Sequence, residues 1–276
     1  METFVRRLDM AAERNHSLLC VGLDPWRPSM PIDDIVAFNR AIIEATCDLV
    51  CAYKPQSAFY EAEGFLGLEA LKETIDAVPD GIPVILDVKR GDLGNTSFAY
   101  AKAAFEFWGS DAVTVSPYMG RDSVQPFLDY EDRGVFVLTR TSNPGGADFE
   151  DLELSGFGEP RYLYEEVARQ AAGWNEAGNV GLVVGATMPE ELAKVRALAG
   201  SMPILIPGIG VQGGDLEMSV RVGTDASGRR AVINAARSVL YASDGQDFAE
   251  AARREAMHLR DAITAELGRI GKGWAS

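Results

Sequence analysis

A short apolar segment followed by an amphipathic stretch is a pattern that repeats eight times along this 276-residue chain. The apolar segments are typical of buried strands, and the longer stretches between them are typical of helices. The predicted strands are residues 18–23, 50–53, 83–88, 112–115, 134–138, 181–184, 203–206 and 231–234. The main predicted helices are residues 34–49, 66–78, 97–108, 162–177, 189–199 and 247–267, and residues 1–7 are expected to begin a further helix.

Eight strand–helix units joined by short turns predict an α/β fold, a closed (β/α)8 TIM barrel formed by a single domain over residues 1–276. An open doubly wound sheet is the alternative, and it would more naturally carry a glycine-rich fingerprint after its first strand. Here the first strand ends in Gly22-Leu23-Asp24-Pro25-Trp26 instead. Residues 141–160 are the longest irregular stretch, and they could form either a mobile lid over the barrel or an ordinary surface loop.

Composition narrows the range of partners and compartments. A net charge of −15 argues against binding to nucleic acid or to an anionic membrane surface. No apolar run is long enough to predict a membrane span, and the N-terminus lacks the apolar core of a signal peptide. Three cysteines close to the N-terminus do not suggest a disulfide framework, so the cytoplasm is the expected location.

The segment Asp87-Val88-Lys89-Arg90-Gly91-Asp92 follows the apolar run Pro83-Val84-Ile85-Leu86 at the end of the third predicted strand. Charges at the end of a buried strand cost free energy unless they pair with one another or take part in chemistry. A solvated cluster of ion pairs is the structural interpretation, but the alternation of acid and base favours a catalytic array.

Other strand ends also carry polar residues. Asp24 follows the first strand, Lys54 follows the second, and Thr141 and Ser142 follow the fifth. Two of the chain's six lysines, Lys54 and Lys89, therefore terminate apolar strands. Active sites of (β/α)8 barrels form at this end of the strands. Asp24 or Lys54 alone could be a structural ion pair, but together with the array they indicate an active site.

Two segments near the C-terminus predict a phosphate site. Pro207-Gly208-Ile209-Gly210-Val211-Gln212-Gly213-Gly214-Asp215 follows the seventh strand, and its glycines allow backbone N–H groups to approach an anion closely. The eighth strand ends in Asn234-Ala235-Ala236-Arg237, which supplies a guanidinium that can bind phosphate through two hydrogen bonds. The loops after strands seven and eight are the usual phosphate site of this barrel.

Together these residues resemble the orotidine 5′-phosphate decarboxylase family over nearly the whole barrel. The segments around Lys89-Arg90-Gly91-Asp92, Thr141-Ser142-Asn143-Pro144 and Val184-Gly185-Ala186-Thr187 are similar to the longer bacterial (type 2) branch. One departure is Ala236, because the arginine after strand eight is commonly preceded by glycine.

The resemblance implies a homodimer that needs no cofactor or metal and converts orotidine 5′-phosphate to UMP and carbon dioxide in de novo pyrimidine biosynthesis. It implies that Lys89 donates the proton to C6, that Asp87 lies near the departing carboxylate, and that Lys54 holds Asp87 and the ribose. Asp92 and Thr96 are expected to reach across the dimer interface into the partner's site. The implied substrate contacts are Asp24 for the ribose, Ser142 for the pyrimidine, and Pro207, Gln212, Ala236 and Arg237 for the phosphate.

Elementary chemistry agrees with the role expected for Lys89. Loss of the carboxylate leaves an electron pair on a carbon without an adjacent electron sink, so a cation must already lie at that carbon. The flanking carboxylates, Asp87 and Asp92, are expected to keep Lys89 protonated.

Three other functions remain open. A metal-dependent sugar-phosphate lyase of related barrel fold would share the acid–base array, but it is expected to have an acidic metal ligand where this chain has Lys54. A Schiff-base aldolase would need a neutral lysine, which acidic neighbours oppose. A nucleotide-binding regulator on an inactive barrel would not need the complete array.

Overall fold

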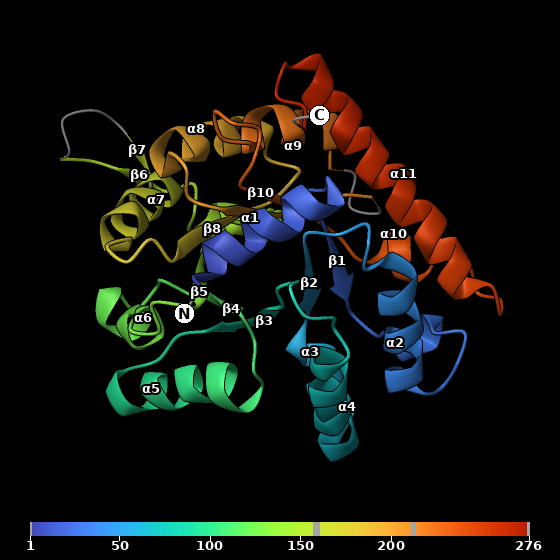
Figure 1. The fold of residues 1–276 in the computed structure, drawn as a ribbon. Coiled ribbons are helices and arrows are strands. Elements are labelled where there is room, and N and C mark those ends of the chain that lie inside the picture. The colour runs from blue at the N-terminus through green and yellow to red at the C-terminus, as the bar shows by residue number, and fades with distance from the viewer. Residues whose placement is uncertain (1, 157–160, 211–213, 275–276) are drawn as a thin grey trace.

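The computed structural model describes residues 2–156, 161–210 and 214–274. Within them, eight parallel strands form one sheet in the order β2-β1-β10-β9-β8-β5-β4-β3. Isolated bridges between Tyr53 and Val84 and between Gln56 and Asp87 join β2 to β3 and close the sheet into a barrel (Figure 1). The predicted TIM barrel is therefore confirmed. Its strands are β1 (Leu19–Leu23), β2 (Ala52–Pro55), β3 (Ile85–Arg90), β4 (Ala112–Val115), β5 (Gly134–Arg140), β8 (Val180–Val184), β9 (Ile204–Pro207) and β10 (Ala231–Ala235).

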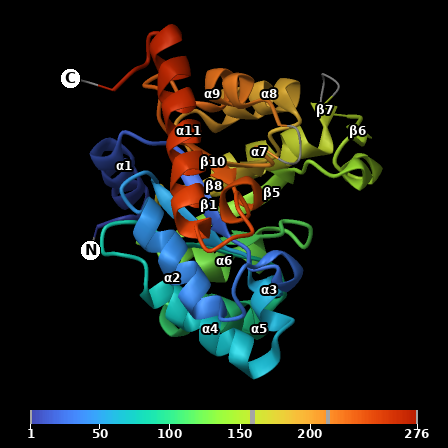
Figure 2. The same cartoon turned by 90° about the vertical axis from the view of Figure 1, so that its right-hand side faces the viewer.

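Helices surround this barrel on the outside, as Figures 1 and 2 show from two directions. Both faces of the strands are thus covered, which is why β1, β4, β8 and β10 are buried along their whole length. None of the described helices is long and apolar enough to cross a membrane. The helices are α1 (Phe4–Asn15), η1 (Arg27–Ser29), α2 (Ile35–Thr46), α3 (Ser57–Glu61), α4 (Gly64–Asp76), α5 (Gly94–Lys102), the π-helical η2 (Ala103–Phe107), α6 (Arg121–Leu128), η3 (Pro144–Asp148), α7 (Leu163–Trp174), α8 (Pro189–Ala199), α9 (Leu216–Gly223), α10 (Arg237–Leu240) and α11 (Phe248–Arg269).

The first helix lies across the amino-terminal ends of the strands. Thr3 caps α1 by accepting a hydrogen bond from Arg6 N. Further along, Asp9 forms a 2.7 Å ion pair with Arg230, the residue before β10. The ring of Phe4 packs on Gly134 at the start of β5, where a Cβ atom would lie 2.3 Å from that ring. The helix α1 therefore covers the amino end of the barrel at β5 and β10, and the carboxyl end is left for a site.

The long stretch after β5 contains more structure than the sequence predicts. It forms η3 and a short strand β6 (Glu153–Leu154), which pairs antiparallel with β7 (Arg161–Tyr162). Arg140, the buried last residue of β5, forms ion pairs with Glu150 at 3.0 Å and with Asp151 at 2.9 Å. These contacts fasten the first part of the stretch to the end of the barrel.

Candidate functional site

Three charged side chains from neighbouring strands meet at the carboxyl end of the barrel. Lys54 Nζ from β2 lies 3.0 Å from Asp87 Oδ2, and Lys89 Nζ lies 2.6 Å from the other oxygen of the same carboxylate. Lys54 and Asp87 are buried, with 4% and 7% of their surfaces exposed. The Lys89 side chain is 44% exposed, so its ammonium group is the part of this triad that a ligand can reach.

The backbone at Lys89 has an unusual conformation that directs its side chain toward Asp87. Its φ angle is +45°, in the left-handed region that L-residues rarely adopt. The register between β3 and β4 shifts between Leu86 and Arg90, so the strand departs from regular pairing at this point. Such local distortion is common where a strand directs a side chain into a site.

Thr114 of β4 holds this distorted segment in place. Its Oγ1 accepts hydrogen bonds from Val88 N at 3.1 Å and from Lys89 N at 3.0 Å. The same hydroxyl donates to Asp87 Oδ1 at 2.8 Å. Thr114 was not among the residues predicted from the sequence, and the available signal was one hydroxyl inside the otherwise apolar strand Ala112–Val115.

The charges of the triad stabilise one another. Burial alone would raise the pKa of Asp87, but the charges of Lys54 and Lys89 and their hydrogen bonds, with that of Thr114, hold it well below its usual range. Burial alone would lower the pKa of Lys54, but the charges of Asp87 and Asp24 raise it above its usual value. The ionised Lys54–Asp87 pair therefore persists in the barrel across the neutral range.

Asp24 lies beside this triad at the end of β1. Burial raises the pKa of Asp24 above its usual value, in opposition to the charge of Lys54. Its Oδ1 atom is buried and has no hydrogen-bond partner among the residues that the structure describes. An unpaired buried acceptor beside the triad can accept a hydrogen bond from a bound ligand.

A small cavity of about 130 Å³ connects Asp24 and Lys54 to the segments predicted to bind phosphate. Gly22 brings β1 close to β10, because a Cβ atom there would lie 2.7 Å from that of Ala236. Arg237 is exposed and forms no ion pair within the described part of the chain. Gln212, also predicted for the phosphate, lies outside the described residues. The cavity is lined by Asp24, Lys54, Pro207, Gly208, Ile209, Asn234, Ala236 and Arg237.

The two polar residues after β5 have different surroundings. The Thr141 hydroxyl donates to Glu150 Oε1 at 2.8 Å, and Thr141 N donates to the same carboxylate. Ser142 is half-buried and lies against Gly185, where a Cβ atom would lie 2.7 Å from that of Ser142. Thr141 thus anchors the loop through Glu150, whereas Ser142 lies over the end of β8.

Asp92 and Thr96 lie apart from the rest of the predicted site. Asp92 is half-buried and accepts a hydrogen bond from Leu93 N at 2.7 Å, while Thr96 is exposed on α5. Within the described ranges, Asp92 forms no ion pair, so Lys89 contacts only one of its two flanking carboxylates. Neither residue lines the small cavity.

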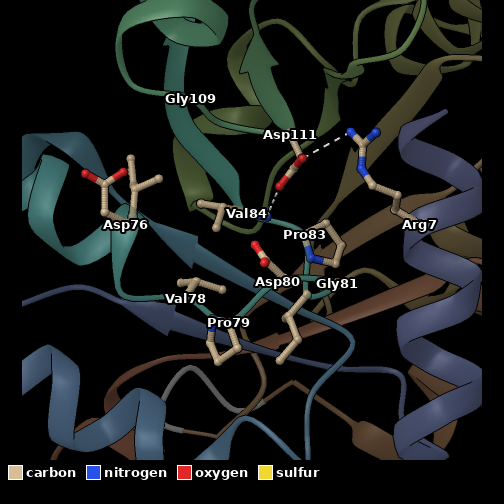
Figure 3. Close-up of a pocket in the computed structure, with 12 residues that line it drawn as sticks. Arg7, Asp76, Val78, Pro79, Asp80, Gly81, Pro83, Val84, Gly109 and Asp111 are labelled. Atoms are coloured by element: carbon tan, nitrogen blue, oxygen red, sulfur yellow. Dashed lines mark hydrogen bonds and ion pairs between the residues drawn. The ribbon is translucent and has the colours of Figure 1, made fainter. Parts of the chain in front are cut away.

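A larger cavity of about 390 Å³ lies at the opposite end of the barrel. Figure 3 shows Asp111 there, which pairs with Arg7 at 3.1 Å and accepts from Val84 N at 2.9 Å. Asp111 and Val84 immediately precede β4 and β3, so the cavity is at the amino-terminal ends of the strands. In barrels of this class, that end contributes stability rather than catalysis.

Comparison with known proteins places the chain in a family. The profile of the Orotidine 5′-phosphate decarboxylase / HUMPS family matches residues 17–252. An orotidine 5′-phosphate decarboxylase of Azoarcus sp. (strain BH72) is 53% identical over 270 residues, covering 95% of this chain and 98% of that protein. One from Dehalococcoides mccartyi (strain ATCC BAA-2266 / KCTC 15142 / 195) is 51% identical over 261 residues, covering 94% of this chain and 97% of that protein.

A solved structure gives the same result. The OMP decarboxylase of Leishmania donovani superimposes with a TM-score of 0.85 at 46% identity, covering 96% of this chain and 98% of that one. The family profile alone spans most of the barrel, including all eight strands of the sheet. The chain belongs to the Orotidine 5′-phosphate decarboxylase / HUMPS family.

Proposed function

We propose that this chain is a carboxy-lyase that converts orotidine 5′-phosphate to UMP and carbon dioxide, with Lys89 as the proton donor. The observation that carries the proposal is the Lys54–Asp87–Lys89 triad, which presents one accessible ammonium group at the carboxyl end of the barrel. The relatives named above are orotidine 5′-phosphate decarboxylases and match nearly the whole chain.

In the proposed reaction, the bond between C6 and the carboxylate carbon breaks, and its electron pair remains on C6. The Lys89 ammonium stabilises this pair and then transfers one proton to it, which gives UMP and a neutral lysine that regains a proton from solvent. Asp87 positions Lys89 through its 2.6 Å contact, and Lys54 in turn positions Asp87 from the buried side.

Repulsion between Asp87 and the substrate carboxylate can supply only part of the catalysis. Two unit charges 4 Å apart interact by about 4 kcal/mol at an effective dielectric constant of 20. Enzymes commonly lower barriers by roughly 8–23 kcal/mol. The aligned ammonium of Lys89 and the binding energy of the distant phosphate must therefore supply the larger share.

The remaining residues bind the parts of the substrate that do not react. Asp24, with its unpaired Oδ1, accepts a hydrogen bond from the ribose. Arg237, with Gln212, Pro207 and the backbone at Ala236, binds the phosphate, and Ser142 contacts the pyrimidine. Support for this assignment comes from the shared cavity, which joins the unpaired acceptor of Asp24 to the guanidinium of Arg237.

We further propose that the enzyme is a cytoplasmic homodimer in which Asp92 and Thr96 complete the partner's site. Neither residue lines the small cavity, and Asp92 lacks an ion-pair partner in the described part of its own chain. Leu93 and Phe98, on the same segment, expose 54% and 55% of their surfaces, which is the kind of apolar face that an interface covers. The three cysteines are free thiols, which suits a reducing compartment.

A metal-dependent sugar-phosphate lyase is disfavoured by Lys54, because its buried ammonium bonds to Asp87 and would repel a divalent cation at that carboxylate. The direct test is to mix the purified protein with orotidine 5′-phosphate in the presence of a chelator and follow the orotate absorbance. Loss of that absorbance with formation of UMP is the expected result. No turnover, or turnover abolished by the chelator and restored by added metal, would contradict the proposal.

A further inference from the structure

Asn234 is a buried amide in the small cavity to which the sequence analysis assigned no role. It lies on β10 with 6% of its surface exposed and lines the cavity with Asp24, Lys54 and Arg237. In the sheet it is paired with Pro207 of β9, the residue at which the predicted phosphate segment begins. The rest of the strand, Ala231-Val232-Ile233 and Ala235, is apolar, so this single amide stands out.

Part of the hydrogen-bond capacity of this amide is unused among the described residues. A side-chain amide can donate two hydrogen bonds and accept two. The Oδ1 atom of Asn234 is buried and has no partner among the described residues, and Oδ1 of Asp24 in the same cavity also has none. Because neither oxygen carries a hydrogen, the two cannot satisfy one another, and a ligand that brings hydroxyl donors would complement both. A ribose phosphate supplies such hydroxyls, together with an anion for Arg237.

The amide packs directly beside β1. A Cβ atom built on Gly22 would lie 3.4 Å from Asn234 Oδ1. The chain offers a useful contrast in Asn179, which is also buried but precedes β8 at the other end of the barrel. Its Oδ1 also has no partner among the described residues, but its Nδ2 donates to Leu128 O at 3.1 Å and to Tyr130 O at 3.3 Å, so it has a structural role.

We infer that Asn234 is a substrate-binding residue whose amide accepts a hydrogen bond from a ribose hydroxyl, next to the hydroxyl bound by Asp24. This inference rests on the proposed decarboxylase function. It predicts that the contribution of Asn234 depends on the sugar and not on the pyrimidine. A structural amide would instead affect all substrates equally.

The test is a thermodynamic cycle that combines one substitution in the enzyme with the removal of one hydroxyl from the substrate. Wild type and Asn234→Leu are assayed with orotidine 5′-phosphate and with its 2′-deoxy and 3′-deoxy analogues. Asn234→Leu should lower kcat/KM for the parent substrate about five- to tenfold, the value of one hydrogen bond. With one of the two deoxy analogues, the same substitution should change kcat/KM less than about twofold, because the hydroxyl is already absent.

Two controls keep the outcome interpretable. Asn179→Leu should lower the unfolding temperature and show equal effects on all three substrates, whereas Asn234→Leu should fold at least as stably as wild type because it removes an unpaired polar group. If Asn234→Leu does not fold, Asn234→Ala takes its place in the cycle. Equal losses with all three substrates, or no loss with the parent substrate, would overturn the inference. Absence of wild-type turnover would instead overturn the proposed function.

Discussion

Replacement of Thr114 by valine tests whether β4 controls the conformation of Lys89, the proposed proton donor. Valine keeps the shape of threonine but removes the hydroxyl, which accepts from Val88 N and Lys89 N and donates to Asp87. Three hydrogen bonds are lost, and one of them is to a buried carboxylate. At roughly 1 kcal/mol for each neutral bond and more for the charged one, the free energy of unfolding should fall by about 2–4 kcal/mol.

Activity should fall as well, because Asp87 loses a donor and Lys89 loses the contact that holds its left-handed backbone. A misplacement of the ammonium should reduce kcat/KM about 10- to 100-fold. The matched control is Thr139→Val on β5, because the buried Thr139 hydroxyl only donates to Val137 O at 3.0 Å. It should cost about 1 kcal/mol and leave kcat/KM nearly unchanged.

The assays are denaturant unfolding and steady-state turnover of orotidine 5′-phosphate for both variants. If Thr114→Val were within about 0.5 kcal/mol of wild type and retained full kcat/KM, Thr114 would not hold the segment. Equal losses in the two variants would also refute the reasoning, since no hydrogen bond joins Thr139 to the triad among the described residues.

Three further predictions concern the substrate anion, the buried ion pair and the dimer. Arg237→Ala should reduce kcat/KM by about 100-fold, although the phosphate that Arg237 is proposed to bind is far from C6. Unchanged kcat/KM would argue that the binding energy of the phosphate does not contribute to catalysis. Because the pKa of Asp87 is lowered in the fold, ionised Asp87 stabilises the protein above about pH 4, and this stabilisation is lost as the pH falls further. The free energy of unfolding should therefore fall more steeply in acid for wild type than for the double variant Lys54→Met/Asp87→Leu. Parallel curves would contradict this. The variants Asp92→Ala and Lys89→Met should each be inactive alone. In an equal mixture after subunit exchange, half of the dimers are mixed and each has one complete site, so about a quarter of the sites should be active. A mixture that stays inactive would exclude a shared site.

The barrel could be predicted from the sequence because its strands are continuous apolar runs, which parallel sheets covered on both faces require. The helices α6 and α9 were not among the predicted segments, since both are short, α6 contains Pro126 and α9 ends at Gly223. The bounds of η2 were also not predictable, because the change from α- to π-helical pairing after Lys102 leaves no pattern of apolar residues.

The candidate site was predictable where charge interrupts an apolar strand, as at Lys54 and Asp87. Thr114 was not, because threonine is an ordinary strand residue and its partner Asp87 is 27 positions away in the sequence. The role inferred for Asn234 likewise could not be predicted, because it depends on residues such as Asp24 that line the same cavity but are distant in the sequence. Asp92 requires a second chain for its assessment, so its role remains a prediction.

The most direct test of the central claim is the rate of UMP formation by Lys89→Met, measured beside the binding of UMP to the same variant. Methionine keeps the length of the side chain but removes the ammonium that contacts Asp87. Binding of UMP should persist while kcat falls by at least about 1000-fold, because the charge and the proton at C6 are both lost. UMP formation at the wild-type rate would show that the ammonium of Lys89 does not carry the reaction.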